Sequence, residues 1–172
     1  MKKLILILIW IANLVLLQAD TVSADVLVAG ESAVLASSFK PVDYRVTKLK
    51  QFLSYYNSPL TDYADYFVYY ADKYQVDWRL VPSISGVEST FGKQIPSNSY
   101  NAYGWANGKY SFRSWAESIE VVNRTLREKY INKGADSIYE ISRIYAPPSQ
   151  TWAFKVKYFM NKLDSLPLEY TI

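Results

Sequence analysis

The chain has 172 residues, half of them apolar, and a net charge of only +3, which suits a single domain preceded by an export segment. It contains neither His nor Cys. This excludes nucleophilic triads with His, thiolate nucleophiles, disulfides and metal sites built from His or Cys. The weak charge gives no sign of a nucleic-acid partner, and no metal and no cofactor are predicted. Acid–base chemistry is left to carboxylates, Lys and Tyr.

The N-terminus is typical of an exported protein. Lys2 and Lys3 precede an apolar run over residues 4–17, and small residues at 22–24 offer a cleavage site. The run is shorter than the roughly 20 residues of a membrane-spanning helix, which predicts a signal peptide over residues 1–24. An uncleaved membrane anchor formed by residues 4–17 is the alternative, and no other membrane contact is expected. In both cases the remainder is predicted to lie in the cell envelope, periplasmic or extracellular.

Residues 25–42 lack periodicity and are predicted to be a linker, whereas residues 43–172 are predicted to form one mainly α domain. Apolar residues recur at helical spacing through most of this domain, and caps and breakers mark the ends of the helices. The predicted helices cover about 44–56, 59 onward with Ser58 as N-cap, 77–90 with Gly92 as C-cap, 114–133, 136–145 with Asp136 as N-cap, and 149–163.

Residues 93–112 change character and are rich in Asn, Gly and aromatic residues. This composition predicts a short irregular lobe, or a hairpin around Asn107 and Gly108.

Glu88 differs from the other carboxylates of the chain. Most of these fit helix caps or exposed helix faces, but Glu88 follows the apolar segment 80–87 and directly precedes the polar, aromatic lobe. A carboxyl held against apolar walls has a raised pKa, and its proton is then available to a general acid near neutral pH. Spacing alone leaves open a solvated Glu at a helix end.

The lobe places amides, a hydroxyl and aromatic rings within nine residues. Sugar rings have apolar faces and hydroxyl edges, so aromatic stacking combined with amide hydrogen bonds is the expected way to hold them. The candidate sugar-binding residues of the lobe are Ser97, Asn98, Asn101, Tyr103 and Trp105. For Tyr103 and Trp105 a core position fits equally well.

Two later aromatic residues are further candidates of the same kind. Tyr145 lies at a predicted helix end before two Pro residues, and Trp152 follows in the next helix. Each is also compatible with a place in the core.

Four segments, in order, resemble motifs of the lysozyme-like superfamily. Residues 88–92 (Glu-Ser-Thr-Phe-Gly) are similar to the Glu-Ser-x-Phe-Gly motif of soluble lytic transglycosylases. Residues 101–105 (Asn-Ala-Tyr-Gly-Trp) resemble the Asn-x-Phe-Gly-Ile motif of bacterial endo-β-N-acetylglucosaminidases of the autolysin and flagellar types. Residues 112–118 and 144–147 resemble the Phe-Arg-x-Tyr, Glu-Ser and Tyr-Ala-Thr-x-Pro segments of those glucosaminidases. The resemblance spans about residues 60–164.

The resemblance implies a lysozyme-like helical fold and an enzyme that cuts peptidoglycan glycan strands at a β-1,4 bond between N-acetylmuramic acid and N-acetylglucosamine. Carried over to this sequence, Glu88 is the catalytic acid and Tyr145 lies near it. Asn101 and Tyr103 line the sugar cleft, and Ser89 supports the turn after the acid. A monomer is expected.

One departure from the glucosaminidase pattern concerns the second acid. Glycosidases usually place two carboxylates about the scissile bond, yet no Asp or Glu occurs between Ser89 and Ala116. This favours a single-acid, lytic transglycosylase-like mechanism, in which Glu88 acts as acid and then as base while the 2-acetamido group of the substrate, positioned by Tyr145, stabilises the cation. A hydrolytic endo-β-N-acetylglucosaminidase with its second acid elsewhere and a non-catalytic cell-wall binding module remain the alternatives.

Overall fold

The computed structural model describes residues 43–168, and over this range the chain forms six α-helices and no strand. They are α3 (Tyr44–Tyr55), α4 (Ala64–Tyr74), α5 (Leu80–Ser89), α6 (Trp115–Thr125), α7 (Ile138–Tyr145) and α8 (Trp152–Ser165). The predicted mainly α class is therefore confirmed for these residues. The predicted signal peptide and linker lie outside them. None of the described helices has the length and apolarity needed to span a membrane.

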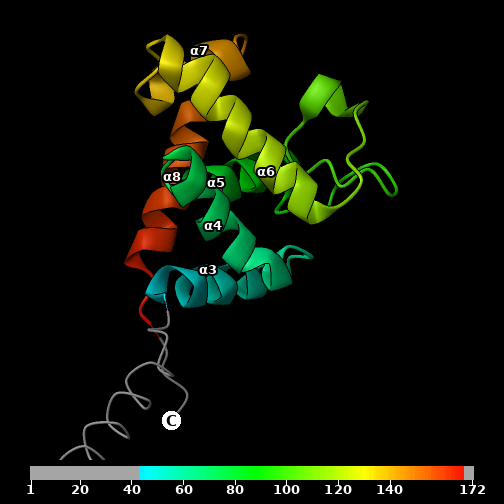
Figure 1. Ribbon diagram of the computed structural model, residues 1–172, viewed down its shortest axis with the longest axis vertical. Coiled ribbons are helices and arrows are strands. Elements are labelled where there is room, and N and C mark those ends of the chain that lie inside the picture. Colours follow the sequence, from blue (N-terminus) through cyan, green and yellow to red (C-terminus); the bar gives the residue numbers. More distant parts are fainter. Residues whose placement is uncertain (1–42, 169–172) are drawn as a thin grey trace, which may run out of the picture. The chain divides into compact units, whose positions relative to one another are not determined.

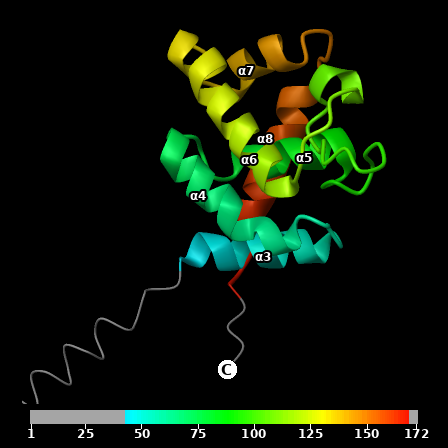
Figure 2. The same cartoon turned by 45° about the vertical axis from the view of Figure 1, so that its right-hand side comes forward.

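Helix α5 is buried over most of its length, with seven of its ten residues classed as buried from solvent. A helix that is enclosed on nearly all sides lies between other helices, and α5 packs against α8 and α6. In two views it lies among α4, α6 and α8 (Figures 1 and 2). Pro82 is tolerated because it occupies the first turn, where backbone N–H groups have no partner within the helix. This central helix carries Glu88 in its last turn.

The surrounding helices each turn one apolar stripe toward this centre. In α3 the buried positions are Leu49, Phe52 and Leu53, and in α8 Val156 and Leu163 are fully buried at helical spacing. In both views α3 lies at one end of the bundle and α7 at the other (Figures 1 and 2). Helix α8 packs against α5. This packing brings residues of α8 to the end of α5 that carries Glu88.

The start of α4 differs from the prediction. Ser58 was expected to cap a helix from residue 59, but a 3₁₀ turn over Thr61–Tyr63 intervenes and α4 begins at Ala64. The Ser58 hydroxyl instead accepts a hydrogen bond from the backbone N–H of Leu60 (3.0 Å) and donates one to the carbonyl of Phe91 (2.7 Å). Its tertiary bond to the chain after α5 takes precedence over helix capping.

The predicted helix 114–133 is not continuous. Ser114 caps α6 by accepting the backbone N–H of Glu117 (3.1 Å), as predicted. Past Thr125, however, the chain continues as a π-helical turn over Leu126–Tyr130 and a 3₁₀ turn over Ile131–Lys133. Helix α7 is capped by Ser137, which forms a capping box with Glu140. The prediction that Asp136 is this cap is therefore wrong.

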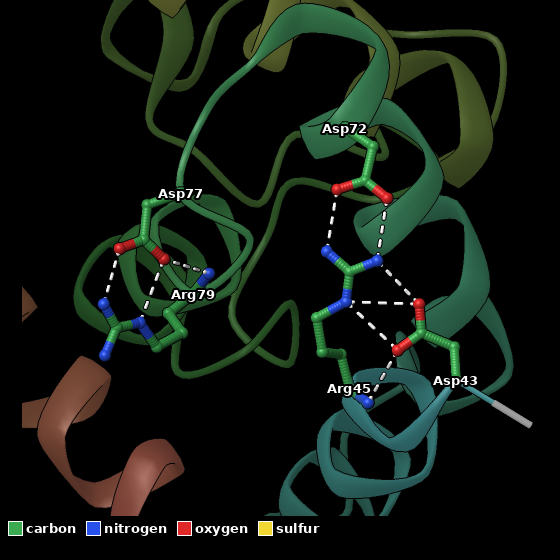
Figure 3. Close-up of polar contacts among 5 residues, drawn as sticks. All are labelled: Asp43, Arg45, Asp72, Asp77 and Arg79. Atoms are coloured by element: carbon green, nitrogen blue, oxygen red, sulfur yellow. Dashed lines mark hydrogen bonds and ion pairs between the residues drawn. The ribbon is translucent and has the colours of Figure 1, made fainter.

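Charged side chains join the first two helices on the outside (Figure 3). The guanidinium of Arg45 contacts Asp43 at the start of α3 (2.6 Å) and Asp72 near the end of α4 (2.7 Å). The hydrogen bonds from Arg45 hold the pKa of Asp43 below its usual value. A second pair, Asp77 with Arg79 (2.6 Å), precedes α5. Because such partly exposed pairs contribute at most about 1 kcal/mol each, they adjust the helix ends and do not determine the fold.

The segment 93–112 is irregular and emerges beside α6 in both views (Figures 1 and 2). Its one regular feature is a short 3₁₀ turn over Trp105–Gly108, in which Ala106 and Asn107 have φ values of 50° and 54°. No hairpin forms around Asn107 and Gly108, since the described residues include no strand. The irregular form of the predicted lobe is the one observed.

Candidate active site

Glu88 is a half-buried carboxyl in the last turn of α5. Its Oε1 accepts a hydrogen bond from the indole Nε1 of Trp152 at 2.7 Å. Burial raises the pKa of Glu88, and the Trp152 N–H partly opposes this rise because it stabilises the charged form. The C-terminal end of a helix also disfavours a negative charge. The site therefore favours a carboxyl that keeps its proton to a higher pH than an ordinary Glu.

The chain turns sharply directly after Glu88. Ser89 ends α5, and the next three residues, Thr90, Phe91 and Gly92, have φ values of 53°, 59° and 79°. Left-handed backbone is unusual for a β-branched or aromatic residue and costs about 1–3 kcal/mol per position. Strain of this kind persists only where the surroundings hold it, and here it lies immediately beside the candidate acid.

Two anchors hold this turn. The Ser89 hydroxyl accepts the backbone N–H of Gly92 (2.8 Å) and lies 2.9 Å from the carbonyl of Ala102, so the prediction that Ser89 supports the turn is confirmed. The ring of Phe91 is fully buried and packs under α5 at Gly86, where a Cβ would lie 2.6 Å from the ring. The residues after Glu88 are thus structural supports for its position.

Residues 101–105 form a loop that is closed by the side chain of Asn101. Its amide Nδ2 donates to the carbonyls of Trp105 and Tyr110 (both 2.9 Å), while its Oδ1 accepts the backbone N–H of Trp105 (3.0 Å). The Ala102 carbonyl faces the Ser89 hydroxyl. The loop is thereby fastened both to itself and to the end of α5.

Gly104 brings the backbone of this loop close to Glu88. Its φ is +68°, and a Cβ built there would lie 2.6 Å from Oε2 of Glu88. Only Gly combines this backbone conformation with so short an approach. One carboxyl oxygen of Glu88 is therefore held by Trp152 and the other lies against the backbone of the loop.

Tyr145 and Trp152 form the remaining wall of the site. Their rings stack with centroids 5.0 Å apart at an angle of 28°, and the Tyr145 hydroxyl donates to the carbonyl of Tyr103 at 2.5 Å. Burial raises the pKa of Tyr145 well above its usual value, and the negative charge of Glu88 adds to the rise. Tyr145 consequently remains neutral, and its hydroxyl proton is committed to the Tyr103 carbonyl.

The structure brings some of the predicted site residues together and leaves others on the irregular lobe. Glu88, Tyr145 and Trp152 come together, although 64 residues separate Glu88 from Trp152. Ser97 and Asn98 are exposed on the irregular lobe, and Trp105 is half-buried there.

Three predicted sugar-binding side chains are buried and offer no open surface to a ligand. Tyr103 is fully buried in the core, so its ring has no surface to offer a ligand, and only its carbonyl reaches the site. Asn101 is 3% exposed, and its side chain is occupied by the loop backbone. Trp152 is equally buried and contacts the acid, so it does not form an open stacking face.

Sequence reasoning missed Gly104 and the role of the Trp152 indole. A Gly within an otherwise bulky loop motif is a signal of close backbone approach, and it could have indicated the first. No sequence pattern pairs Trp152 with Glu88, because their contact depends on the packing of α8 against α5.

No second carboxylate acts on Glu88 within residues 43–168, where burial and the Trp152 N–H account for its shifted pKa. In the same part of the chain, no group of three or more acidic side chains is arranged to hold a metal ion. A recess of about 400 Å³ does occur in the described structure, but it lies by Leu80 and Ile138, and Glu88 is not among its lining residues.

The chain matches no known family model, and no curated protein and no solved structure is significantly similar to it. The function is therefore inferred from the site itself.

Proposed function

We propose that the protein is a peptidoglycan-cleaving enzyme with a lysozyme-like fold, in which Glu88 is the single catalytic acid. The bond cut is a β-1,4 linkage between N-acetylmuramic acid and N-acetylglucosamine. The observation that carries the proposal is the environment of Glu88: a half-buried carboxyl with a raised pKa, beside a strained turn. A proton held to near-neutral pH is what a general acid requires.

The single acid determines the proposed chemistry. Glu88 donates its proton to the glycosidic oxygen, the bond from that oxygen to C1 breaks, and the leaving sugar departs as an alcohol. The 2-acetamido oxygen of the sugar that carries C1 then bonds to C1, as in substrate-assisted glycosidases. Glu88, now a carboxylate, removes the proton of the sugar 6-hydroxyl while that oxygen attacks C1. The acetamido group is released, a 1,6-anhydro sugar forms and the proton returns to Glu88, so no water is consumed.

Tyr145 is the proposed group that positions the acetamido group of the substrate. Its hydroxyl proton is committed to the Tyr103 carbonyl, which leaves lone pairs to accept the N–H of an acetamido group. The acetamido oxygen is then free to face C1. Trp105, which follows Gly104, and Ser97 and Asn98, which are exposed on the lobe, are the proposed contacts to neighbouring sugars. Peptidoglycan is the proposed partner.

Clearing of purified peptidoglycan by the full chain tests this proposal. The wild type is expected to clear the suspension, and Glu88→Gln to lose on the order of 10²–10⁴-fold of the rate, the usual contribution of a general acid. Glu128→Gln is the matched control, since Glu128 is exposed on the turn after α6.

Three other outcomes would contradict the proposal, and two of them would support an alternative. Clearing that proceeds equally well with Glu88→Gln would remove Glu88 from the mechanism. A wild type that binds the wall without clearing it would make the protein a binding module. Cleavage that yields reducing ends without anhydro ends would make it a hydrolytic endo-β-N-acetylglucosaminidase.

A further inference from the structure

The two oxygens of the Glu88 carboxyl have different surroundings. Oε1 accepts the Trp152 indole N–H at 2.7 Å. Oε2 lies beside the backbone of Gly104, and none of the described residues donates a hydrogen bond to it. An indole N–H is a donor only, so Oε1 must be the acceptor in this hydrogen bond.

We propose that Trp152 is a positioning residue that directs the transferable proton of Glu88 to Oε2. The inference rests on the proposed function of Glu88 as the catalytic acid. A proton placed on Oε1 would compete with the indole hydrogen for the same oxygen, whereas a proton on Oε2 leaves the Trp152 bond intact. The carboxyl therefore presents its O–H on the side of the lobe, where the glycan is proposed to bind.

The surroundings of Trp152 make it suited to such a role. The side chain is 3% exposed and begins α8, where its backbone N–H is held by the Ser149 hydroxyl at 3.1 Å. Its ring stacks on Tyr145, and the Tyr145 hydroxyl is bonded to the carbonyl of Tyr103. Tyr103 immediately precedes Gly104, so one connected set of contacts fixes the surroundings of both carboxyl oxygens.

The other groups around Glu88 are uncharged. Helix α7 faces it with Tyr145, which is neutral because burial raises its pKa well above the usual value. Helix α8 faces it with the uncharged Trp152, and the lobe faces it with the backbone of Gly104. No charged side chain within residues 43–168 contributes to the shifted pKa of Glu88.

The test replaces the donor and keeps the ring. Trp152→Phe retains a flat ring against Tyr145 but removes the N–H, and benzothienylalanine at position 152 keeps the full indole shape with sulfur in place of the N–H. The proposal predicts a fall in kcat on the order of 100-fold, the usual cost of a misplaced catalytic group, with KM little changed. It also predicts that the basic limb of the pH profile moves to higher pH, because the carboxylate has lost a donor.

Trp78→Phe is the matched control, since Trp78 is half-buried near the other end of α5 and should alter neither quantity. ¹³C NMR of the labelled Glu88 carboxyl provides a readout that does not depend on turnover, and its pKa should rise in both position-152 variants. If the wild type cleaves glycan and both variants keep its kcat and its basic limb, the role of Trp152 is wrong while the function of Glu88 stands. If the wild type cleaves no glycan, both proposals fail.

Discussion

Gly104 approaches Glu88 so closely that a Cβ on Gly104 would lie 2.6 Å from the carboxyl Oε2. The contact joins the irregular lobe to the end of the central helix α5. Since Trp152 holds the other oxygen, a shift of the carboxyl away from an added methyl group disturbs this hydrogen bond. The lobe and α8 together thus determine the orientation of Glu88.

Gly104→Ala is predicted to lower turnover per folded molecule as well as the stability of the fold. The left-handed backbone alone costs about 1–2 kcal/mol for a residue with a Cβ, and the methyl group displaces the Glu88 carboxyl as well. The matched control is Gly134→Ala, because Gly134 has φ +91° with no atom within 4 Å of an added Cβ. Thermal unfolding and turnover per folded molecule distinguish the two effects: equal turnover in both variants would show that the approach of Gly104 does not matter.

Ser89→Ala is predicted to destabilise the turn after α5. The substitution leaves the backbone N–H of Gly92 without its partner and removes a contact to the Ala102 carbonyl, both in a buried region. An unsatisfied buried polar group costs about 1–3 kcal/mol, which chemical denaturation can measure. Ser165→Ala, at an exposed hydroxyl at the end of α8, should change the free energy of unfolding by less than about 0.5 kcal/mol. Similar values for the two variants would contradict the bracing role of Ser89.

Tyr145→Phe is predicted to lower turnover while the protein remains folded. The change removes the hydrogen bond to the Tyr103 carbonyl, worth about 1 kcal/mol, and with it the lone pairs proposed to receive the acetamido N–H. Tyr139→Phe is the control on the same helix, since the Tyr139 side chain is exposed. Turnover of Tyr145→Phe at the wild-type rate would exclude Tyr145 from the reaction and leave it a purely structural residue.

Glu88→Gln is predicted to be more stable than the wild type at neutral pH. Burial raises the pKa of Glu88 in the folded state, so the folded protein binds this proton more tightly than the unfolded chain does. The resulting loss of stability begins as the pH rises through the unfolded value of about 4.3 and is complete above the folded value. Gln has no such penalty.

The advantage of Glu88→Gln should therefore shrink as the pH falls toward about 4. Thermal unfolding at neutral and acidic pH measures it. Asp43 and Glu117, whose pKa values are lowered by hydrogen bonds from Arg45 and Arg113 respectively, are the same in both proteins and cancel in the comparison. A variant that is less stable than the wild type at neutral pH would contradict the raised pKa.

Helical periodicity and local capping predicted much of the fold. The first predicted helix, 44–56, agrees closely with α3, and Ser114 caps α6 as expected. Among the predictions that failed, one depends on a hydrogen bond to a residue distant in the sequence. Ser58 bonds to Phe91 and so does not open α4, and nothing local indicated the change from α-helix to π-helical turn after Thr125.

The sequence predicted the residue types of the candidate site better than it predicted what each residue does there. Apolar neighbours and a polar lobe identified Glu88, whose burial the structure bears out in part. Aromatic residues, however, are equally suited to a core and to a sugar site, and Tyr103 is in the core. The left-handed backbone at Thr90 and Phe91 also has no sequence signature, because neither residue favours this conformation.

Mass spectrometry of the fragments released from peptidoglycan tests the central claim most directly. The full wild-type chain is expected to release fragments that end in 1,6-anhydro sugars, and Glu88→Gln is expected to release none while Glu128→Gln matches the wild type. Fragments with reducing ends alone would contradict the single-acid mechanism. The same fragments from Glu88→Gln, or no fragments from the wild type, would contradict the assignment of Glu88 as the catalytic acid.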